Sequence, residues 1–204
     1  MSHARGVRAG VASTVTWVSS YGSSVVALVL AAAALTKLFR RDRLIFLVYH
    51  YRIVPMPAAR WIARVLPETE LVLAALLLGR VSVTYASIAA SGLFALFAGA
   101  IALNLLRGRS DIPCGCFGAN DSSRIGWGHV ARNAVLGSVA FASAWWPGEP
   151  VAALSDDHVS SVAAAAVTLT CWWLAGVAAR MWRDVDPDAA LAAGPAVTGS
   201  MEVR

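Results

Sequence analysis

The stretch VVALVLAAAALTKLF, residues Val25–Phe39, decides the fold of this chain, because it carries a single charged residue, Lys37. A helix needs about 20 mostly apolar residues to cross the hydrocarbon core of a bilayer. The apolar character begins earlier, near Trp17, and no small-residue cleavage site follows it. We therefore predict a membrane-spanning helix over residues 17–38, which is retained and not removed as a signal peptide.

The composition of the whole chain agrees with a membrane protein. The 204 residues are 58% hydrophobic and only 14% charged, and the mean hydropathy is +0.62. A soluble domain carries about 25% charged residues. This composition excludes a disordered chain and a soluble enzyme, and three cysteines are too few for a secreted disulfide scaffold. The basic residues lie between apolar runs and form no basic stripe, so we expect membrane lipid around the chain and no nucleic-acid partner.

Four further stretches are long and apolar enough, or nearly so, to cross a bilayer. The fold class we predict is all-α, a polytopic transmembrane helix bundle with a four-helix core plus a fifth C-terminal span. Residues 1–16 form an N-terminal extension, residues 17–183 one bundle domain and residues 184–204 a disordered tail. The predicted spans are 17–38, 66–79, 83–106, 130–146 and 159–182.

Two details concern the second span. Pro67 stands near its predicted start, which is typical of a first helical turn. The preceding connection contains LIFLVYHYRIV, which is apolar but too short to cross, so we interpret it as an interfacial or re-entrant segment with Tyr49, Tyr51 and Trp61 at the membrane surface.

Five spans fix which loops share a membrane face. The connection after the first span, the loop between the third and fourth spans, and the C-terminal tail lie on one side, here called the cysteine-loop side. Most polar groups that stand out in the sequence are expected near this side. They are the two cysteines Cys114 and Cys116 with the candidate cofactor-binding residues Lys37, Glu70, Asn104, Arg132 and Asn133.

The cysteine-loop side carries the sequence DIPCGCFG, residues 111–118. Two cysteines one residue apart close a small, strained disulfide, and strained exposed disulfides are labile and suited to exchange. Arg107, Arg109 and Arg124 lie near enough in sequence to stabilise a thiolate. The alternatives are a chance pair in a loop, or a Cu(I) or Zn site with Cys114, Cys116, His129 and His50 as ligands.

The remaining polar residues of the spans each allow two interpretations. Lys37 either reaches the interface or pairs with Glu70, because an acid within a span is costly and usually partnered. Asn104 and Asn133 either join helices by hydrogen bonds or contact a quinone carbonyl. His129 marks an interface or relays protons. Cys171 we expect to be a buried packing residue, with a resolving thiol as the alternative.

The phrase LPETEL (66–71), then LLRGR (105–109), CGCFG (114–118) and Arg132-Asn133 resembles the methylamine-utilisation MauE family, which is grouped with DoxX-like redox-associated membrane proteins. Lys37 fits this resemblance, which covers about residues 22–146. It implies thiol–disulfide chemistry beside a thioredoxin-like partner, in support of the maturation of a disulfide-rich extracytoplasmic protein. The layout is also similar to vitamin K epoxide reductase and DsbB, where a four-helix bundle holds a quinone beside a cysteine pair. Those proteins have a second cysteine pair, which this chain lacks, so a partner would supply the second dithiol.

The two guides to orientation disagree. The cysteine-loop side holds fourteen Lys and Arg residues and the other side three, Arg5, Arg8 and Arg80, which would place the cysteine loop in the cytoplasm. The family role places it outside the cell membrane, where disulfides form, and we favour this orientation.

The hypothesis is a plasma-membrane thiol–disulfide oxidoreductase or redox maturation factor. It would use Cys114 and Cys116 to exchange electrons with a thioredoxin-like or substrate protein, coupled to a quinone near Lys37 and Glu70. The alternatives are a non-enzymatic scaffold that docks a redox partner and a Cu- or Zn-handling membrane protein.

Overall fold

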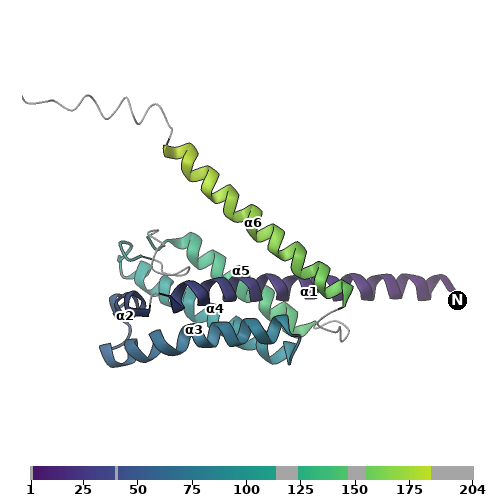
Figure 1. Cartoon of the computed structure of the whole chain (residues 1–204), viewed down its shortest axis with the longest axis horizontal. Helices are drawn as coiled ribbons and strands as arrows, with labels where there is room; N and C mark the ends of the chain where they lie inside the picture. The colour runs from purple at the N-terminus through teal and green to yellow at the C-terminus, as the bar shows by residue number, and fades with distance from the viewer. Residues whose placement is uncertain (1, 40, 114–123, 147–154, 185–204) are drawn as a thin grey trace, which may run out of the picture. The chain divides into compact units, whose positions relative to one another are not determined.

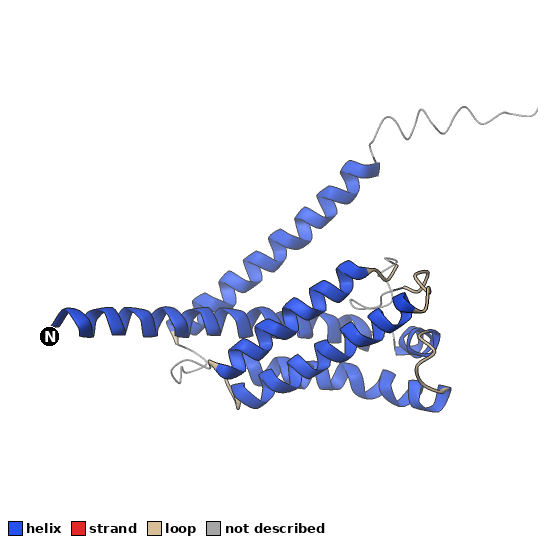
Figure 2. Cartoon of the chain, turned by 180° about the vertical axis from the view of Figure 1, so that it is seen from behind, coloured by secondary structure: helices blue, strands red, loops and turns tan. Residues whose placement is uncertain are grey.

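A computed structural model describes residues 2–39, 41–113, 124–146 and 155–184, and it describes side chains between residues 14 and 176 of these ranges. Figure 2 shows that these residues form helices joined by short connections, with no strand among them. The chain divides into two compact units, residues 1–166 and residues 167–204. The helices are α1 (Ser2–Leu38), α2 (Arg41–His50), α3 (Met56–Leu78), α4 (Val83–Leu106), α5 (Trp127–Trp145) and α6 (Asp156–Asp184).

The first unit has a core between four helices. Helix α1 packs on α3 and α5, α4 packs on α5 and α3, and the short α2 lies against α3 and α1 (Figure 1). Small residues allow these helices to approach closely, as is usual where helices associate in lipid. A Cβ atom added at Gly137 of α5 would lie 3.4 Å from the Phe94 Cβ of α4. The buried apolar core consists of Val26, Ala27, Leu30, Leu73, Ala74, Leu77, Ala86, Ala90, Phe94 and Ala140.

Three helical segments are long and apolar enough to cross a membrane: Thr14–Leu38, Val83–Leu106 and Asp156–Gly176. Large apolar side chains such as Leu96 and Phe141 are exposed on the outside of the first unit, where lipid would cover them. The prediction of an all-α membrane protein is therefore confirmed. Helix α3 carries four charged residues between Arg60 and Glu70, which explains why its composition alone does not mark it as a span.

Helix α3 differs from the sequence prediction at its start. It begins at Met56, ten residues before the predicted start at residue 66, because Pro55 and Pro57 supply the start signal. Pro67 therefore lies inside the helix and not in its first turn, and it is buried. Since proline has no N–H, the carbonyl of Ala63 lacks its usual helical donor.

Two other segments are helical where the sequence predicted less structure. The segment expected to lie at the interface contains α2, over Arg41–His50, and residues 2–16 continue α1 without a break. The single-domain assignment for residues 17–183 stays a prediction, and the tail from residue 185 lies outside the described residues.

The α3–α4 turn has an unusual backbone. Arg80 and Ser82 have φ angles of 56° and 50°, in the left-handed region that costs a non-glycine residue on the order of 1 kcal/mol. Gly79, by contrast, closes α3 with an ordinary right-handed conformation. The two left-handed positions of this turn are therefore occupied by residues other than glycine.

In the second unit, the α6 residues from Val167 to Leu174 include several exposed large side chains, among them Trp172 and Trp173. Cys171 is a free thiol and is exposed. The expectation that Cys171 is a buried packing cysteine was therefore wrong: its bulky neighbours are exposed too, so they do not enclose it.

Candidate functional site

One end of the first unit gathers most of the predicted site residues. The C-terminal ends of α1 and α4, the N-terminal end of α5 and the whole of α2 lie together there (Figure 1). This follows from the connectivity, because α1 and α4 run toward this end and α3 and α5 run away from it. Lys37, Glu70, Asn104 and Asn133 are all buried. Lys37 and Asn104 lie in the last turns of α1 and α4, Asn133 lies in the second turn of α5, and Glu70 lies midway along α3.

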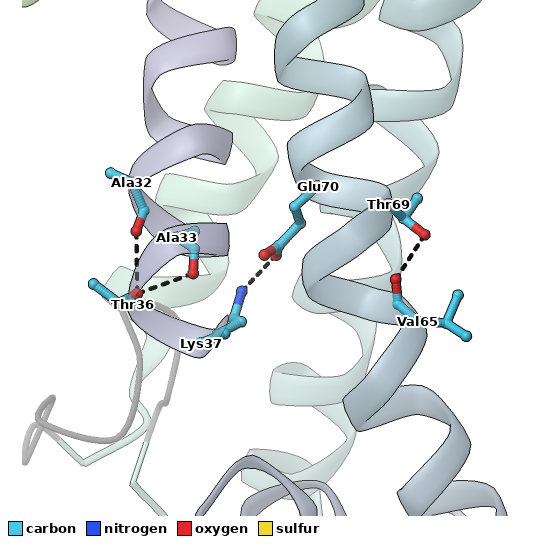
Figure 3. A network of polar contacts seen from close by, with 7 residues as sticks. All are labelled: Ala32, Ala33, Thr36, Lys37, Val65, Thr69 and Glu70. Atoms are coloured by element: carbon cyan, nitrogen blue, oxygen red, sulfur yellow. Dashed lines mark hydrogen bonds and ion pairs between the residues drawn. The ribbon is translucent and has the colours of Figure 1, made fainter. Parts of the chain in front are cut away.

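Lys37 and Glu70 form a buried ion pair between α1 and α3. The Lys37 Nζ atom donates to Glu70 Oε1, and the two side chains are 4% and 0% exposed. Figure 3 shows the two side chains pointing toward one another, while Thr36 and Thr69 bond back to carbonyls of their own helices. The ammonium also lies 5.2 Å from the centre of the Phe97 ring, within the range of a cation–π contact. The predicted pairing of Lys37 with Glu70 is observed.

The second oxygen of the Glu70 carboxylate, Oε2, is buried and has no hydrogen-bond partner among the residues that the structure describes. Glu70 lines a small cavity of about 20 Å³ together with Phe94, Phe97, Arg132 and Asn133. Such a volume holds a single water molecule. This volume is far smaller than a quinone ring requires. Quinone binding by this protein stays a prediction.

Asn104 connects the end of α4 to α2 through an arginine. Its Oδ1 atom accepts a hydrogen bond of 2.9 Å from Arg109 Nη1, and its amide nitrogen donates to the Ala100 carbonyl one turn earlier. Arg109 also donates to the carbonyl oxygens of His50 (2.8 Å) and Tyr51 (3.3 Å) at the end of α2. The asparagine therefore holds the arginine that fixes the C-terminal end of α2.

The two asparagines share one kind of contact. Asn133 donates to the His129 carbonyl of its own helix, at 2.7 Å, and is buried beside the Glu70 cavity. Each amide nitrogen donates to a carbonyl one turn back in its own helix, and a role of either asparagine in joining helices directly or in contacting a quinone stays a prediction. The long-range connection that is observed here is made by a charged side chain, Arg109. The sequence carried a signal for it, since Arg109 follows the buried Asn104 by five residues.

Cys114 and Cys116 lie outside the described residues, but the two ends of their loop are described. Pro113 and Arg124 form an antiparallel bridge, and the Ile125 N–H donates to the Ile112 carbonyl at 2.9 Å. The side chains of Ile112 and Ile125 are buried with Ile101 of α4. Outside this apolar contact, Arg124 pairs with Asp111 at 2.9 Å. The residue before Cys114 is therefore held against the bundle.

Two of the three arginines that we expected to stabilise a cysteine thiolate, Arg109 and Arg124, form hydrogen bonds with other residues. Arg124 contacts Asp111, and Arg109 contacts Asn104 and α2. In the described residues, no cluster of three His, Cys, Asp or Glu side chains is close enough to hold a metal ion. The predicted alternative with Cys114 and Cys116 as metal ligands falls on residues that are not described.

Comparison with known proteins places this arrangement in context. Residues 15–146 match the family described as methylamine utilisation protein MauE. The chain is 37% identical over 144 residues to the methylamine utilization protein MauE of Paracoccus denitrificans, covering 70% of this chain and 77% of that protein. It is 39% identical over 160 residues to the protein of the same name from Methylophilus methylotrophus, covering 78% and 83%. No solved structure matches the chain.

Proposed function

Because the chain belongs to the MauE family, we propose that it acts in methylamine utilisation as a membrane thiol–disulfide exchange protein. Cys114 and Cys116 are its redox pair, and a thioredoxin-like protein or a disulfide-containing substrate protein is its partner. The observation that carries the proposal is the held base of the cysteine loop: the backbone at Ile112 and Pro113 is paired with Arg124 and Ile125 directly before the first cysteine.

The exchange conserves atoms and electrons between the two proteins. In one direction, a partner thiolate attacks the Cys114–Cys116 disulfide, one cysteine leaves as a thiolate, and a mixed disulfide forms. The second partner thiolate then attacks the mixed disulfide and releases the other cysteine. The partner dithiol loses two electrons and two protons, and the Cys114–Cys116 pair gains them. The reverse sequence reduces a partner disulfide.

The geometry supports this chemistry in a specific way. A disulfide spanning only one intervening residue is strained, and Gly115 gives the backbone the freedom to adopt both redox states. The paired backbone at residues 112–113 and 124–125 gives the segment between them a fixed base. Arg109 and Asn104 fix the neighbouring end of α2, so a partner would meet a preformed surface.

We further propose five membrane spans in the plasma membrane, with the cysteine loop on the extracytoplasmic side. Helices α3 and α5 then cross beside α1 and α4, with the charged pair Lys37 and Glu70 sealed inside. Labelling of intact cells with a membrane-impermeant maleimide, before and after a mild reductant, tests this orientation. Labelling of Cys114 and Cys116 only after reduction is expected, whereas labelling only after lysis would place the loop in the cytoplasm.

The redox proposal is tested on a Cys171→Ser background, which leaves Cys114 and Cys116 as the only cysteines. The purified protein is equilibrated in mixtures of oxidised and reduced glutathione, whose potential lies in the range of labile exchange disulfides, then alkylated and weighed by mass spectrometry. We expect a single transition between a form with no free thiol and a form with two. A pair that stays fully reduced in every mixture would contradict the proposal.

The partner exchange is tested in cells. On the same Cys171→Ser background, Cys114→Ser and Cys116→Ser, made singly, leave one thiol that is able to trap a mixed disulfide with a partner protein, which a non-reducing gel reveals. The double variant is expected to lose both the trapped species and complementation of a Paracoccus denitrificans strain that lacks its own MauE, scored as growth on methylamine. Retained complementation by the double variant would favour the scaffold instead, and copper or zinc retained by the purified protein and lost in the double variant would favour metal handling.

A further inference from the structure

We propose that the end of the first unit opposite the cysteine loop holds a binding site for a phosphate group, supplied by a phospholipid of the surrounding membrane. The site lies where the α3–α4 turn meets α1 and the first turns of α6 (Figure 1). Arg80, His158 and a group of buried serines form it. The proposed redox chemistry uses none of these residues.

Direct contacts bring the three elements together. Arg80 Nη1 donates to Ser23 Oγ of α1 at 3.5 Å. The Ser24 hydroxyl lies 3.5 Å from the Ser161 hydroxyl of α6. His158 Nε2 contacts the Leu78 carbonyl at 3.0 Å, two residues before Arg80, so the imidazole lies beside the turn that carries the guanidinium.

Several polar atoms of this end are buried without a partner. Arg80 Nε, His158 Nδ1, Ser87 Oγ and Ser19 Oγ have no hydrogen bond within the described residues, although the His158 side chain is only 3% exposed. Leaving a buried donor without an acceptor destabilises the folded state, and such atoms call for a ligand or water. Four of the five orphaned atoms found in the described residues belong to this end; the fifth is Glu70 Oε2.

The orphaned atoms suit an anion with several acceptor oxygens. Arg80 is a partly buried cation, and none of the three ion pairs in the described residues includes it. Because the Leu78 carbonyl only accepts, His158 Nε2 carries the hydrogen of that bond, and Nδ1 is the ring nitrogen without a partner in the described residues. Hydroxyl groups of Ser19 and Ser87 add neutral donors. A phosphate offers acceptors to the guanidinium and to these hydroxyl groups, and guanidinium groups bind phosphate well.

The depth of the site in the membrane points to a lipid as the source. Exposed aromatic residues, which gather where a membrane meets water, mark this end of the unit. Trp17 is 41% exposed and stacks on Tyr21, one turn before the buried serines of α1, and Tyr85 of α4 is 78% exposed. Arg80 therefore lies at the level where lipid phosphates lie. The nearby carboxylates of Asp156 and Asp157 are exposed, so they do not enter the buried cluster.

The test uses the whole protein, delipidated in detergent, with three probes: dioleoylphosphatidylglycerol, dioleoylglycerol as the same lipid without phosphate, and inorganic phosphate. Native mass spectrometry counts bound lipid, and the thermal midpoint is followed against probe concentration. We expect phosphatidylglycerol to bind and raise the midpoint and dioleoylglycerol to do neither. Arg80→Gln should weaken the binding about tenfold or more, because a charge-assisted hydrogen bond is lost.

Two variants make the test decisive. Arg64→Gln removes an exposed arginine of α3 at the other end, so it measures the general loss of charge and should bind lipid as the wild type does. His158→Gln keeps an amide able to bond to Leu78 and removes the orphaned Nδ1, so it tests the site even if Arg80→Gln fails to fold.

Equal binding by Arg80→Gln, His158→Gln and Arg64→Gln would overturn the proposal, as would equal binding of dioleoylglycerol and phosphatidylglycerol by the wild type. A full midpoint shift with inorganic phosphate, lost in Arg80→Gln, would confirm the phosphate chemistry and assign free phosphate as the ligand.

Discussion

Lys37 and Glu70 face each other across the α1–α3 contact with both side chains shielded from solvent, 4% and 0% exposed (Figure 3). Two opposite charges in an apolar bundle cost desolvation free energy that their attraction offsets only while both are present. The pair therefore makes the packing of α1 on α3 depend on each partner.

Removing one member of this pair should destabilise the protein strongly. Lys37→Met leaves the Glu70 carboxylate buried without its ammonium partner, and Glu70→Met leaves the Lys37 ammonium buried without its carboxylate partner. Each is expected to cost about 3–5 kcal/mol of unfolding free energy, measured by thermal or detergent-induced unfolding.

The double variant Lys37→Met with Glu70→Met should recover most of that loss, because apolar side chains of similar size replace both charges. The control is Arg41→Gln, which breaks an ion pair with Glu68 whose side chains are 44% and 56% exposed, and should cost less than about 1 kcal/mol. Additive losses in the double variant would mean that the two charges do not stabilise each other.

Arg109 should control the order of α2. Arg109→Gln removes the bonds to the His50 and Tyr51 carbonyls, so the amide hydrogens of α2 should exchange faster with solvent while the rest of the unit is unchanged. Hydrogen exchange followed by mass spectrometry measures this. Arg107→Gln, two residues earlier and exposed, is the matched control, and an equal effect of both substitutions would show that charge and not bonding matters.

The apolar contact at the base of the cysteine loop should matter more than the ion pair beside it. Ile112→Ala removes a buried side chain from the cluster with Ile101 and Ile125 and is expected to cost about 2–5 kcal/mol. The Ile125 amide, which donates to the residue 112 carbonyl, should then exchange faster. Arg124→Gln breaks a pair whose side chains are 75% and 82% exposed, and should leave both the thermal midpoint and the exchange rate nearly unchanged.

Gly137 should tolerate no large side chain. An added Cβ would lie 3.4 Å from Phe94 Cβ and 3.6 Å from the Ser91 carbonyl, so Gly137→Leu forces α4 and α5 apart. Overpacking of this kind costs about 1–3 kcal/mol or more, visible as a lower thermal midpoint. Gly99→Leu is the control, because nothing lies within 4 Å of a Cβ there, and a loss as large as that of Gly137→Leu would refute the close approach.

Several features of this protein follow from local sequence. The uncharged apolar stretch 83–106 was predicted as a span, and α4 covers the same residues, Val83–Leu106. This prediction succeeds because the composition of about 20 consecutive residues decides membrane insertion. The partner of Glu70 was also predictable, since an acid among apolar residues requires a cation and Lys37 is the only lysine in the chain.

Other features depended on contacts that no local pattern encodes. The sequence did not predict the start of α3 at Met56, because Arg60 and Arg64 are more typical of a loop than of a membrane span. In the structure these two side chains are exposed on one face of the helix, and the opposite face is buried. The hydrogen bonds of Asn104 and Asn133 depend on which atoms lie within reach in the folded protein. The exposure of Cys171 depends on how little of α6 packs against other residues there.

The sequence by itself determined that this is an all-α membrane protein of the MauE family with a CGC pair in one loop, because hydropathy and motif residues act over short stretches. Only the tertiary structure decided that Arg109 binds Asn104 and α2, that Ile112 and Ile125 hold the base of the loop, and that Arg80 meets Ser23 while His158 contacts Leu78. Each of these contacts joins residues from different elements or across a loop, so its formation depends on how the helices pack and not on the identity of neighbouring residues.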